Sequence, residues 1–237
     1  MTDRSVPAKS ARADVAAFLA KAKSLPVPAT AASRRGRLIF AMDATASREP
    51  SWTQAARIQG EMFRATQALG GLEIQLVHYG GLAEFGASAW LADAAALVAR
   101  MAEVRCASGE TQIANVLRHA LAETARRKVN AVVFVGDAVE ESPDALAGLA
   151  GKLGLAGVPV FVFHEGGEPL ARRTFEQVAR LSRGAYCPFD ANSARQLKDL
   201  LSAVAVYAAG GHRALEDYGR RGGSQDVLRL TAQIGRR

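Results

Sequence analysis

Residues 37–47, RLIFAMDATAS, join a short apolar run to a loop of small polar residues. The apolar part, Arg37–Met42, has the length and composition of a buried strand, and it ends at Asp43. In a sheet of parallel strands, ligands bind beyond the carboxyl ends of the strands. This segment therefore predicts a central strand with polar residues placed where a ligand would bind.

Strand and helix patterns alternate along the rest of the chain. The run 131–135, AVVFV, is apolar without a break, which is typical of a strand buried on both faces of a parallel sheet. Strands that alternate with helices imply βαβ crossovers and a doubly wound sheet. The expected strands are 37–42, 72–79, 82–85, 131–135, 158–163 and 185–187, and the expected helices are 52–69, 91–104, 112–127, 142–153, 170–182 and 193–208.

The predicted fold class is therefore α/β, a doubly wound, mostly parallel, Rossmann-like sheet with helices on both faces. The segment 82–85 is expected to form one antiparallel edge strand, because Gly80-Gly81 makes a turn after 72–79. A chain of 237 residues suits one such domain with additional ends. No apolar run approaches the ~18–20 residues that cross a bilayer, so no membrane segment is expected.

Charge is unevenly distributed along the chain. Residues 1–36 contain seven basic and two acidic residues, and residues 209–237 contain six and three. The segment 37–208 contains 17 basic and 18 acidic residues, so the positive charge belongs to the ends. We interpret 1–36 as a basic arm with a helical pattern at 10–24, 37–208 as the domain, and 209–237 as a basic tail. Nucleic-acid binding is expected only through these ends, because the body is close to neutral.

Three polar segments follow one another at expected strand or helix ends. They are Asp43-Ala-Thr45-Ala-Ser47, the loop Ser108–Thr111 and Gly136-Asp137. If the strands are as expected, all three lie at one edge of the sheet. Among their residues, Asp43 and Asp137 offer two carboxylates and Thr45, Ser47 and Thr111 offer three hydroxyls, without an imidazole or a thiolate. Such hard oxygen ligands suit Mg²⁺, Mn²⁺ or Ca²⁺ better than zinc or copper.

The order and spacing of these segments resemble the von Willebrand factor A (VWA) domain, over about residues 37–208. The metal-ion-dependent adhesion site (MIDAS) of that family has Asp-x-Ser-x-Ser after the first strand, a Thr in a later loop and an Asp after a central strand. Asp43, Ser47, Thr111 and Asp137 match this pattern, and Thr45 stands where the first Ser is usual. Gly136-Asp137-Ala138 replaces the commoner Thr-Asp-Gly. Within the family the chain looks most similar to bacterial cytoplasmic A-domain proteins.

The resemblance implies a metal-dependent protein–protein interaction module. Thr45 or Ser47, together with Thr111, would bind the metal directly, while Asp43 and Asp137 would act through water. Mg²⁺ is the expected ion, with Mn²⁺ or Ca²⁺ as alternatives. An open coordination position would accept an Asp or Glu carboxylate from a protein partner. The location expected is cytoplasmic, which agrees with only two cysteines, Cys106 and Cys187.

A Mg²⁺-dependent hydrolase or phosphotransferase on a similar sheet is the alternative function. The phosphatase pattern with a nucleophilic Asp needs a second Asp two residues later, where this chain has Thr45. No phosphate-binding loop, nucleophile elbow or dinucleotide fingerprint is present in the sequence. Binding is therefore preferred over catalysis.

Each candidate residue also has a structural interpretation. Asp43 is of a type that caps helices or stabilises turns, and Thr111 could cap the helix 112–127. Glu140 and Glu141 either extend the site or, the interpretation we prefer, are acidic residues at the start of the next helix, favoured by its dipole. His164 ends a strand with no partner apparent from the sequence. Acidic residues of the tail could occupy the metal of a neighbouring copy, the candidates being Glu216, Asp217 and Asp226.

Overall fold

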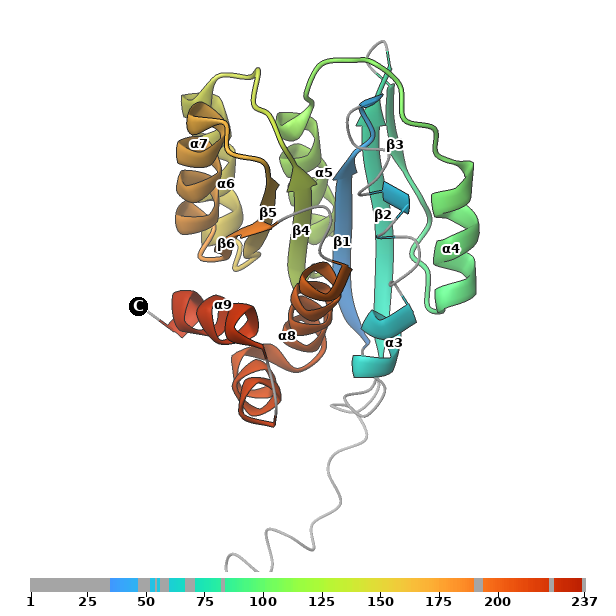
Figure 1. Ribbon diagram of the computed structural model, residues 1–237, viewed down its shortest axis with the longest axis vertical. Helices are drawn as coiled ribbons and strands as arrows, with labels where there is room; N and C mark the ends of the chain where they lie inside the picture. The colour runs from blue at the N-terminus through green and yellow to red at the C-terminus, as the bar shows by residue number, and fades with distance from the viewer. Residues whose placement is uncertain are drawn as a thin grey trace, which may run out of the picture. The chain divides into compact units, whose positions relative to one another are not determined.

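A six-stranded sheet runs through the computed structural model (Figure 1). The strands lie side by side in the order β3-β2-β1-β4-β5-β6, and every neighbouring pair is parallel except β2 and β3. The strands are β1 (Gly36–Asp43), β2 (Leu72–Gly80), β3 (Glu84–Ala87), β4 (Ala131–Gly136), β5 (Val160–Glu165) and β6 (Ala185–Phe189). The predicted mostly parallel sheet with one antiparallel edge strand is confirmed.

The structure describes residues 35–46, 52–53, 55, 60–66, 71–81, 84–189, 194–221 and 224–235. The expected arm with its helical pattern at 10–24 lies outside the described residues, as does Ser47. In the described part of the chain, no helix is long and apolar enough to cross a membrane.

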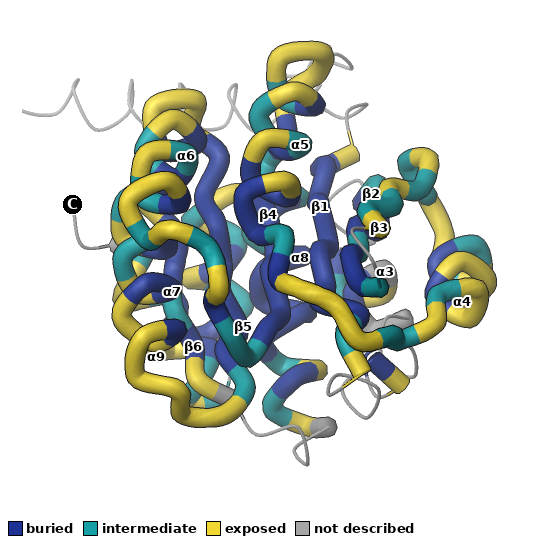
Figure 2. The backbone as a smooth tube through the Cα atoms, turned by 90° about the horizontal axis from the view of Figure 1, so that it is seen from above, coloured by how far each residue is buried: buried dark blue, intermediate teal, exposed yellow. Residues whose placement is uncertain are grey.

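Helices cover both faces of the sheet, and two apolar clusters fill the space beneath them. One cluster packs under α5, α6 and α7, and the other under α3, α4, α8 and α9. The bounds are α3 (Gly60–Thr66), α4 (Ala94–Glu103), α5 (Ile113–Arg126), α6 (Pro143–Leu155), α7 (Pro169–Leu181), α8 (Ala194–Arg220) and α9 (Gln225–Gly235). In the view of Figure 2 the central strands β1, β4 and β5 are buried, the edge strand β3 is partly exposed, and the helices expose their outer sides.

β1 shows why its sequence is apolar without alternation. Leu38, Phe40 and Met42 belong to the cluster under α3, α4 and α8, whereas Ile39 and Ala41 belong to the cluster under α5. Successive side chains of a strand point to opposite faces, so a strand covered on both sides is apolar at every position.

The end of the chain, where the sequence predicts a basic tail after residue 208, is helical. α8 continues to Arg220 with a kink at Gly211, whose φ of 73° is a conformation that favours glycine. α9 packs on α8 and on β6. Leu215, Val227 and Leu230 are fully or almost fully buried in the core cluster on that side of the sheet. The apolar residues between the arginines therefore form a docked face; the domain boundaries themselves stay a prediction.

Candidate functional site

Asp43 lies at the carboxyl end of β1, between the ends of two other strands. It pairs in register with Tyr79 of β2, and on the other side Met42 pairs with Val135, two residues before Asp137. Asp43 is only 1% exposed. Its Oδ1 accepts a hydrogen bond of 2.7 Å from the backbone N–H of Thr45, which turns the chain back immediately after the strand. The predicted turn interpretation of Asp43 is thus confirmed, and it leaves the second carboxylate oxygen outside that turn.

The phenol of Tyr79 indicates which acidic side chains gather here. Tyr79 lies on the face of the sheet covered by α5, and alternation along β1 places Asp43 on the same face. The residue is completely buried, and its hydroxyl makes no hydrogen bond of good geometry within the described part of the chain. Burial raises the pKa of Tyr79 well above its usual value, and the negative charges of Asp43, Glu141 and Asp137 raise it further. The buried phenol therefore lies within electrostatic reach of three carboxylates.

Thr111 is held at the start of α5 by a reciprocal pair of hydrogen bonds. Its backbone N–H donates to Glu140 Oε2 at 2.7 Å, and its hydroxyl accepts from the backbone N–H of Glu140 at 3.1 Å. The hydroxyl also donates to Glu141. Thr111 is 7% exposed. The loop before α5 is therefore tied to the segment that follows Asp137, at the same edge of the sheet.

Glu141 caps α5, and this corrects the interpretation of the acidic pair as the start of the next helix. Its carboxylate accepts hydrogen bonds from the N–H groups of Ile113 (2.6 Å) and Ala114 (2.8 Å), and Gln112 at the cap position makes no such bond. These N–H groups have no partner within the helix, and the positive end of the helix dipole favours an anion there. Burial raises the pKa of Glu141, against the opposing effect of these donors. α6 is instead capped by Ser142.

The loop between α4 and α5 crosses the ends of β1 and β2 and is fixed to both by backbone contacts (Figure 1). The N–H of Ala107 donates to the carbonyl of Ala44 at 2.9 Å, and the N–H of Gly81 donates to the carbonyl of Ala107 at 3.4 Å. Gly109 packs so closely that a Cβ there would lie 2.1 Å from the carbonyl oxygen of Gly81. We call this carboxyl edge of the sheet, with residues 43–45, 107–111 and 136–137, the rim.

Asp137 follows β4 directly and is half-buried. Its backbone carbonyl lies 3.3 Å from Nε2 of His164, a fully buried residue of β5. The other ring nitrogen, Nδ1, lies 2.8 Å from the hydroxyl of Tyr186 on β6. The sequence shows His164 at a strand end but gives no signal for these partners, because they come from two other strands.

The rim brings together four of the five predicted metal-binding residues, namely Asp43, Thr45, Thr111 and Asp137. Ser47, the fifth, lies outside the described residues. In the described chain no group of three or more His, Cys, Asp or Glu residues could hold a metal. A cation at the rim would therefore need hydroxyl ligands as well as carboxylates, and the five-residue site stays a prediction.

The oxygen donors present fit a hard divalent cation. The Thr111 hydroxyl accepts one hydrogen bond and donates one to its neighbours, and a threonine hydroxyl has two acceptor lone pairs. Within the described residues, one lone pair thus stays available for a cation. The buried Tyr79 hydroxyl offers a donor to the water or carboxylate oxygens around such an ion.

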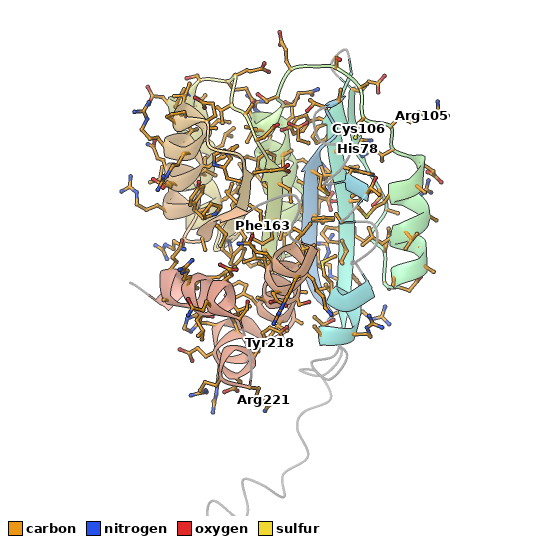
Figure 3. All side chains as sticks on the ribbon, viewed as in Figure 1. His78, Arg105, Cys106, Phe163, Tyr218 and Arg221 are labelled. Atoms are coloured by element: carbon orange, nitrogen blue, oxygen red, sulfur yellow. The ribbon has the colours of Figure 1, made fainter. Side chains whose placement is uncertain are left out.

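A cavity of about 550 Å³ adjoins the rim between β2, β3 and α4. The cavity is lined by Ala44 of the rim and, among others, by Gly80, Arg105, His78 and Arg100. Figure 3 labels His78 and Arg105, which both line this cavity. His78 is half-buried with its ring edge-on to Trp52 (6.1 Å between centroids), and burial lowers its pKa.

Comparisons with protein-family models and with curated proteins found no match. Solved structures do match. A von Willebrand factor type A protein from Catenulispora acidiphila superposes with a TM-score of 0.60 at 14% identity, over 74% of this chain and 43% of that one. The chain has the von Willebrand factor A fold.

Two other VWA structures agree with this result. The SpRpn10 VWA domain has a TM-score of 0.57 at 12% identity, over 71% of this chain and 94% of that domain. Proximal thread matrix protein 1 of the mussel byssus has a TM-score of 0.57 at 16% identity, over 73% of this chain and 47% of that one. A second structure of the mussel protein has a zinc-occupied MIDAS motif. The VWA-like chain spans less than half the length of the mussel and Catenulispora chains.

Proposed function

We propose that the rim binds a divalent cation and, through it, an acidic residue of a protein partner. Mg²⁺ is the ion we expect, and Mn²⁺ or Ca²⁺ would use the same oxygen donors. Thr111 with Thr45 or Ser47 would bind the ion directly, and Asp43 and Asp137 would hold its water ligands. The partner would supply an Asp or Glu carboxylate to the remaining position.

The observation that carries this proposal is that Asp43 and Asp137 follow adjacent parallel strands at one edge of the sheet, with the buried Tyr79 in register with Asp43. Asp43, Asp137 and Glu141 all act on one fully buried phenol, and Thr111 is hydrogen-bonded to Glu141. Carboxylates that lie close together repel one another, so their proximity is favourable only if positive charge compensates it. The N-terminus of α5 compensates Glu141. A divalent cation between Asp43 and Asp137 would compensate the other two.

A carboxylate-binding function agrees with the charge balance at such a site. An ion held by neutral hydroxyls and water-bridged carboxylates keeps part of its positive charge, which attracts a further anionic ligand. A bound metal supplies Lewis acidity at a fixed point, and a partner carboxylate gains a strong charge-assisted contact there. The loops on either side of the rim, and the adjoining cavity, would select the partner by shape.

The first test is thermal unfolding of the full chain with and without Mg²⁺, Mn²⁺ or Ca²⁺. A ligand at about 100 times its Kd stabilises the native state by about 2.7 kcal/mol, which raises the Tm of a domain of this size by roughly 5–10 °C. We expect this gain for the wild type and its loss in Asp43→Asn and Thr111→Val. Asp43→Asn keeps an oxygen that accepts from Thr45, so the turn survives.

Asp144→Asn, at an exposed position in the first turn of α6, is the matched control and should keep the full gain. The partner is tested by a pull-down in Mg²⁺ or in chelator, with wild type and Asp43→Asn as baits. Binding that survives both chelator and Asp43→Asn would exclude a metal-bridged contact. If none of the three ions changed the Tm of the wild type, the proposed cation site would be wrong.

A further inference from the structure

A chain of hydrogen bonds leads from the rim toward the β6 edge of the sheet. The carbonyl of Asp137, the imidazole of His164 and the hydroxyl of Tyr186 are joined at 3.3 Å and 2.8 Å. Asp137 follows β4, His164 lies near the end of β5 and Tyr186 near the start of β6, and these three strands are adjacent. His164 has no exposed surface, and the ring of Phe175 lies edge-on against it, 5.1 Å away between centroids.

The partners decide which nitrogen of His164 carries the proton. A carbonyl oxygen can only accept, so Nε2 must donate to Asp137. Burial lowers the pKa of His164, which favours the neutral ring. A neutral ring with Nε2–H has an acceptor at Nδ1, so the Tyr186 hydroxyl donates to it. The hydrogen bonds therefore all donate in one direction, from the phenol of Tyr186 to the imidazole of His164 and from the imidazole to the backbone carbonyl of Asp137.

Gln233 of α9 binds the backbone of Tyr186 at the free edge of β6. The side-chain amide of Gln233 accepts from the N–H of Tyr186 at 2.9 Å and donates to its carbonyl at 3.0 Å. This pair imitates the bonds of a neighbouring strand, on the free edge of β6. Gln233 therefore fixes the backbone of Tyr186, and His164 fixes its hydroxyl.

We propose that His164 is a positioning residue for the cation site, which acts by holding the backbone carbonyl of Asp137 through Nε2–H. The Tyr186 hydroxyl keeps the ring in the tautomer that can do so. The proposal rests on the proposed cation-binding function of the rim. Outer groups that orient metal ligands commonly change metal affinity by about 10–100-fold when they are removed.

The test compares two substitutions at one position. His164→Gln places an amide N–H close to the position of Nε2 and keeps a donor for the carbonyl, whereas His164→Leu removes it. With the full chain and Mn²⁺ as the probe, titration calorimetry should show a Kd about tenfold or more weaker in His164→Leu, with His164→Gln close to wild type. Tyr186→Phe should show an intermediate loss, because the ring can then adopt the other tautomer.

His119→Leu is the matched control, since His119 is also a partly buried, hydrogen-bonded histidine, bound to Gln75 away from the rim. It should change stability but not the Kd for Mn²⁺. Amide hydrogen exchange at 136–139 in the metal-free protein gives a second readout. Exchange should accelerate in His164→Leu and stay at the wild-type rate in His164→Gln.

The outcomes separate the two proposals. A wild type that does not bind Mn²⁺ overturns the proposed function and the role of His164 with it. A wild type that binds Mn²⁺ while His164→Leu binds it equally tightly overturns the role of His164 alone. Equal weakening in His164→Gln and His164→Leu would mean that the ring fills space and does not act as a donor, which also overturns it.

Discussion

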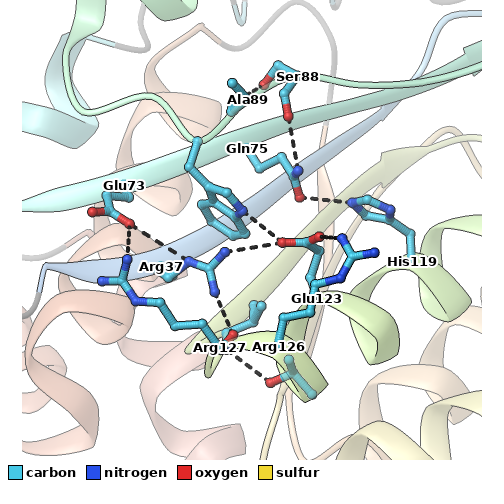
Figure 4. A network of polar contacts seen from close by, with 12 residues as sticks. Arg37, Glu73, Gln75, Ser88, Ala89, His119, Glu123, Arg126 and Arg127 are labelled. Carbon is cyan, nitrogen blue, oxygen red and sulfur yellow. Dashed lines mark hydrogen bonds and ion pairs between the residues drawn. The ribbon is translucent and has the colours of Figure 1, made fainter.

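Arg37, at the start of β1, is a charged residue in a position where the strand is otherwise apolar. Only 4% of it is exposed, and its guanidinium lies 3.6 Å from the centre of the Trp90 ring. It donates to Glu123 at 3.1 Å and to the carbonyl of Arg127 (Figure 4). Glu123 also accepts a hydrogen bond of 2.8 Å from the Trp90 indole. Buried charges are tolerated when they are paired and hydrogen-bonded in this way.

Glu123→Gln should destabilise the protein at neutral pH by about 3 kcal/mol, because it leaves the buried Arg37 with only the more distant carboxylate of Glu73, at 3.8 Å, as a counter-charge. Burial alone would raise the pKa of Glu123, but the Trp90 donor and the positive charges of His119, Arg126 and Arg37 outweigh it and lower the pKa. The stabilisation is therefore present above the ordinary carboxyl pKa and is lost as pH falls through the lower folded value. Urea unfolding from pH 7 downward should show wild type and variant converging in acid.

Glu103→Gln is the matched control for this change. Glu103 forms an ion pair with Arg100 at 2.8 Å, but both side chains are more than half exposed. Exposed pairs contribute about 0–1 kcal/mol, so this variant should stay close to wild type at every pH. Similar losses in Glu103→Gln and Glu123→Gln would contradict the buried network.

Among the elements, α9 differs most from the sequence-based expectation, because it packs on α8 and β6 where a basic tail is predicted. Leu230 on its inner side has no exposed surface, whereas Leu228 is 50% exposed. Leu230→Ala should therefore lower the free energy of unfolding by about 2–5 kcal/mol, the usual cost of a cavity in a core. Leu228→Ala should cost less than about 1 kcal/mol, because most surface substitutions do.

Urea unfolding of the two alanine variants checks this prediction directly, since both make the same substitution on the same helix. Equal costs at the two positions would mean that α9 does not dock through Leu230. Circular dichroism of both variants would show whether the helix itself persists.

The sequence predicts an element well when the signal for it lies within the element's own residues. Apolar runs identify β1, β4 and β5, and the residues that follow these runs place Asp43 and Asp137 at one edge of the sheet. The contacts of Glu141 could not be predicted, because its donors at Ile113 and Ala114 are 28 and 27 residues away and a helix-start position explains the same residue locally. The docking of α9 could not be decided from the sequence, because the apolar residues among the arginines of 213–237 fit both a docking helix and a disordered peptide that folds on binding.

For the whole molecule, the excess positive charge lies in the two ends of the chain and not in the segment that contains the rim. The segment 37–208 is close to neutral, while residues 1–36 contain seven basic and two acidic residues. Affinity for nucleic acid that comes from a few phosphate contacts falls steeply with salt. We therefore expect any binding of duplex DNA to come from the ends and to be independent of the cation at the rim.

Replacing Arg4, Lys9 and Arg12 by Gln should weaken the binding of a DNA duplex at low salt and make it less dependent on salt, because fewer cationic side chains then contact phosphates; fluorescence anisotropy measures both. The same variant should keep the full increase in Tm with Mg²⁺, since no residue of the rim is altered. Asp43→Asn should do the reverse, keeping DNA binding and losing the response to Mg²⁺. DNA binding at about 200 mM salt that depends on Asp43 would link the two activities, and the rim would then have to be assigned a nucleic-acid ligand in place of a protein carboxylate.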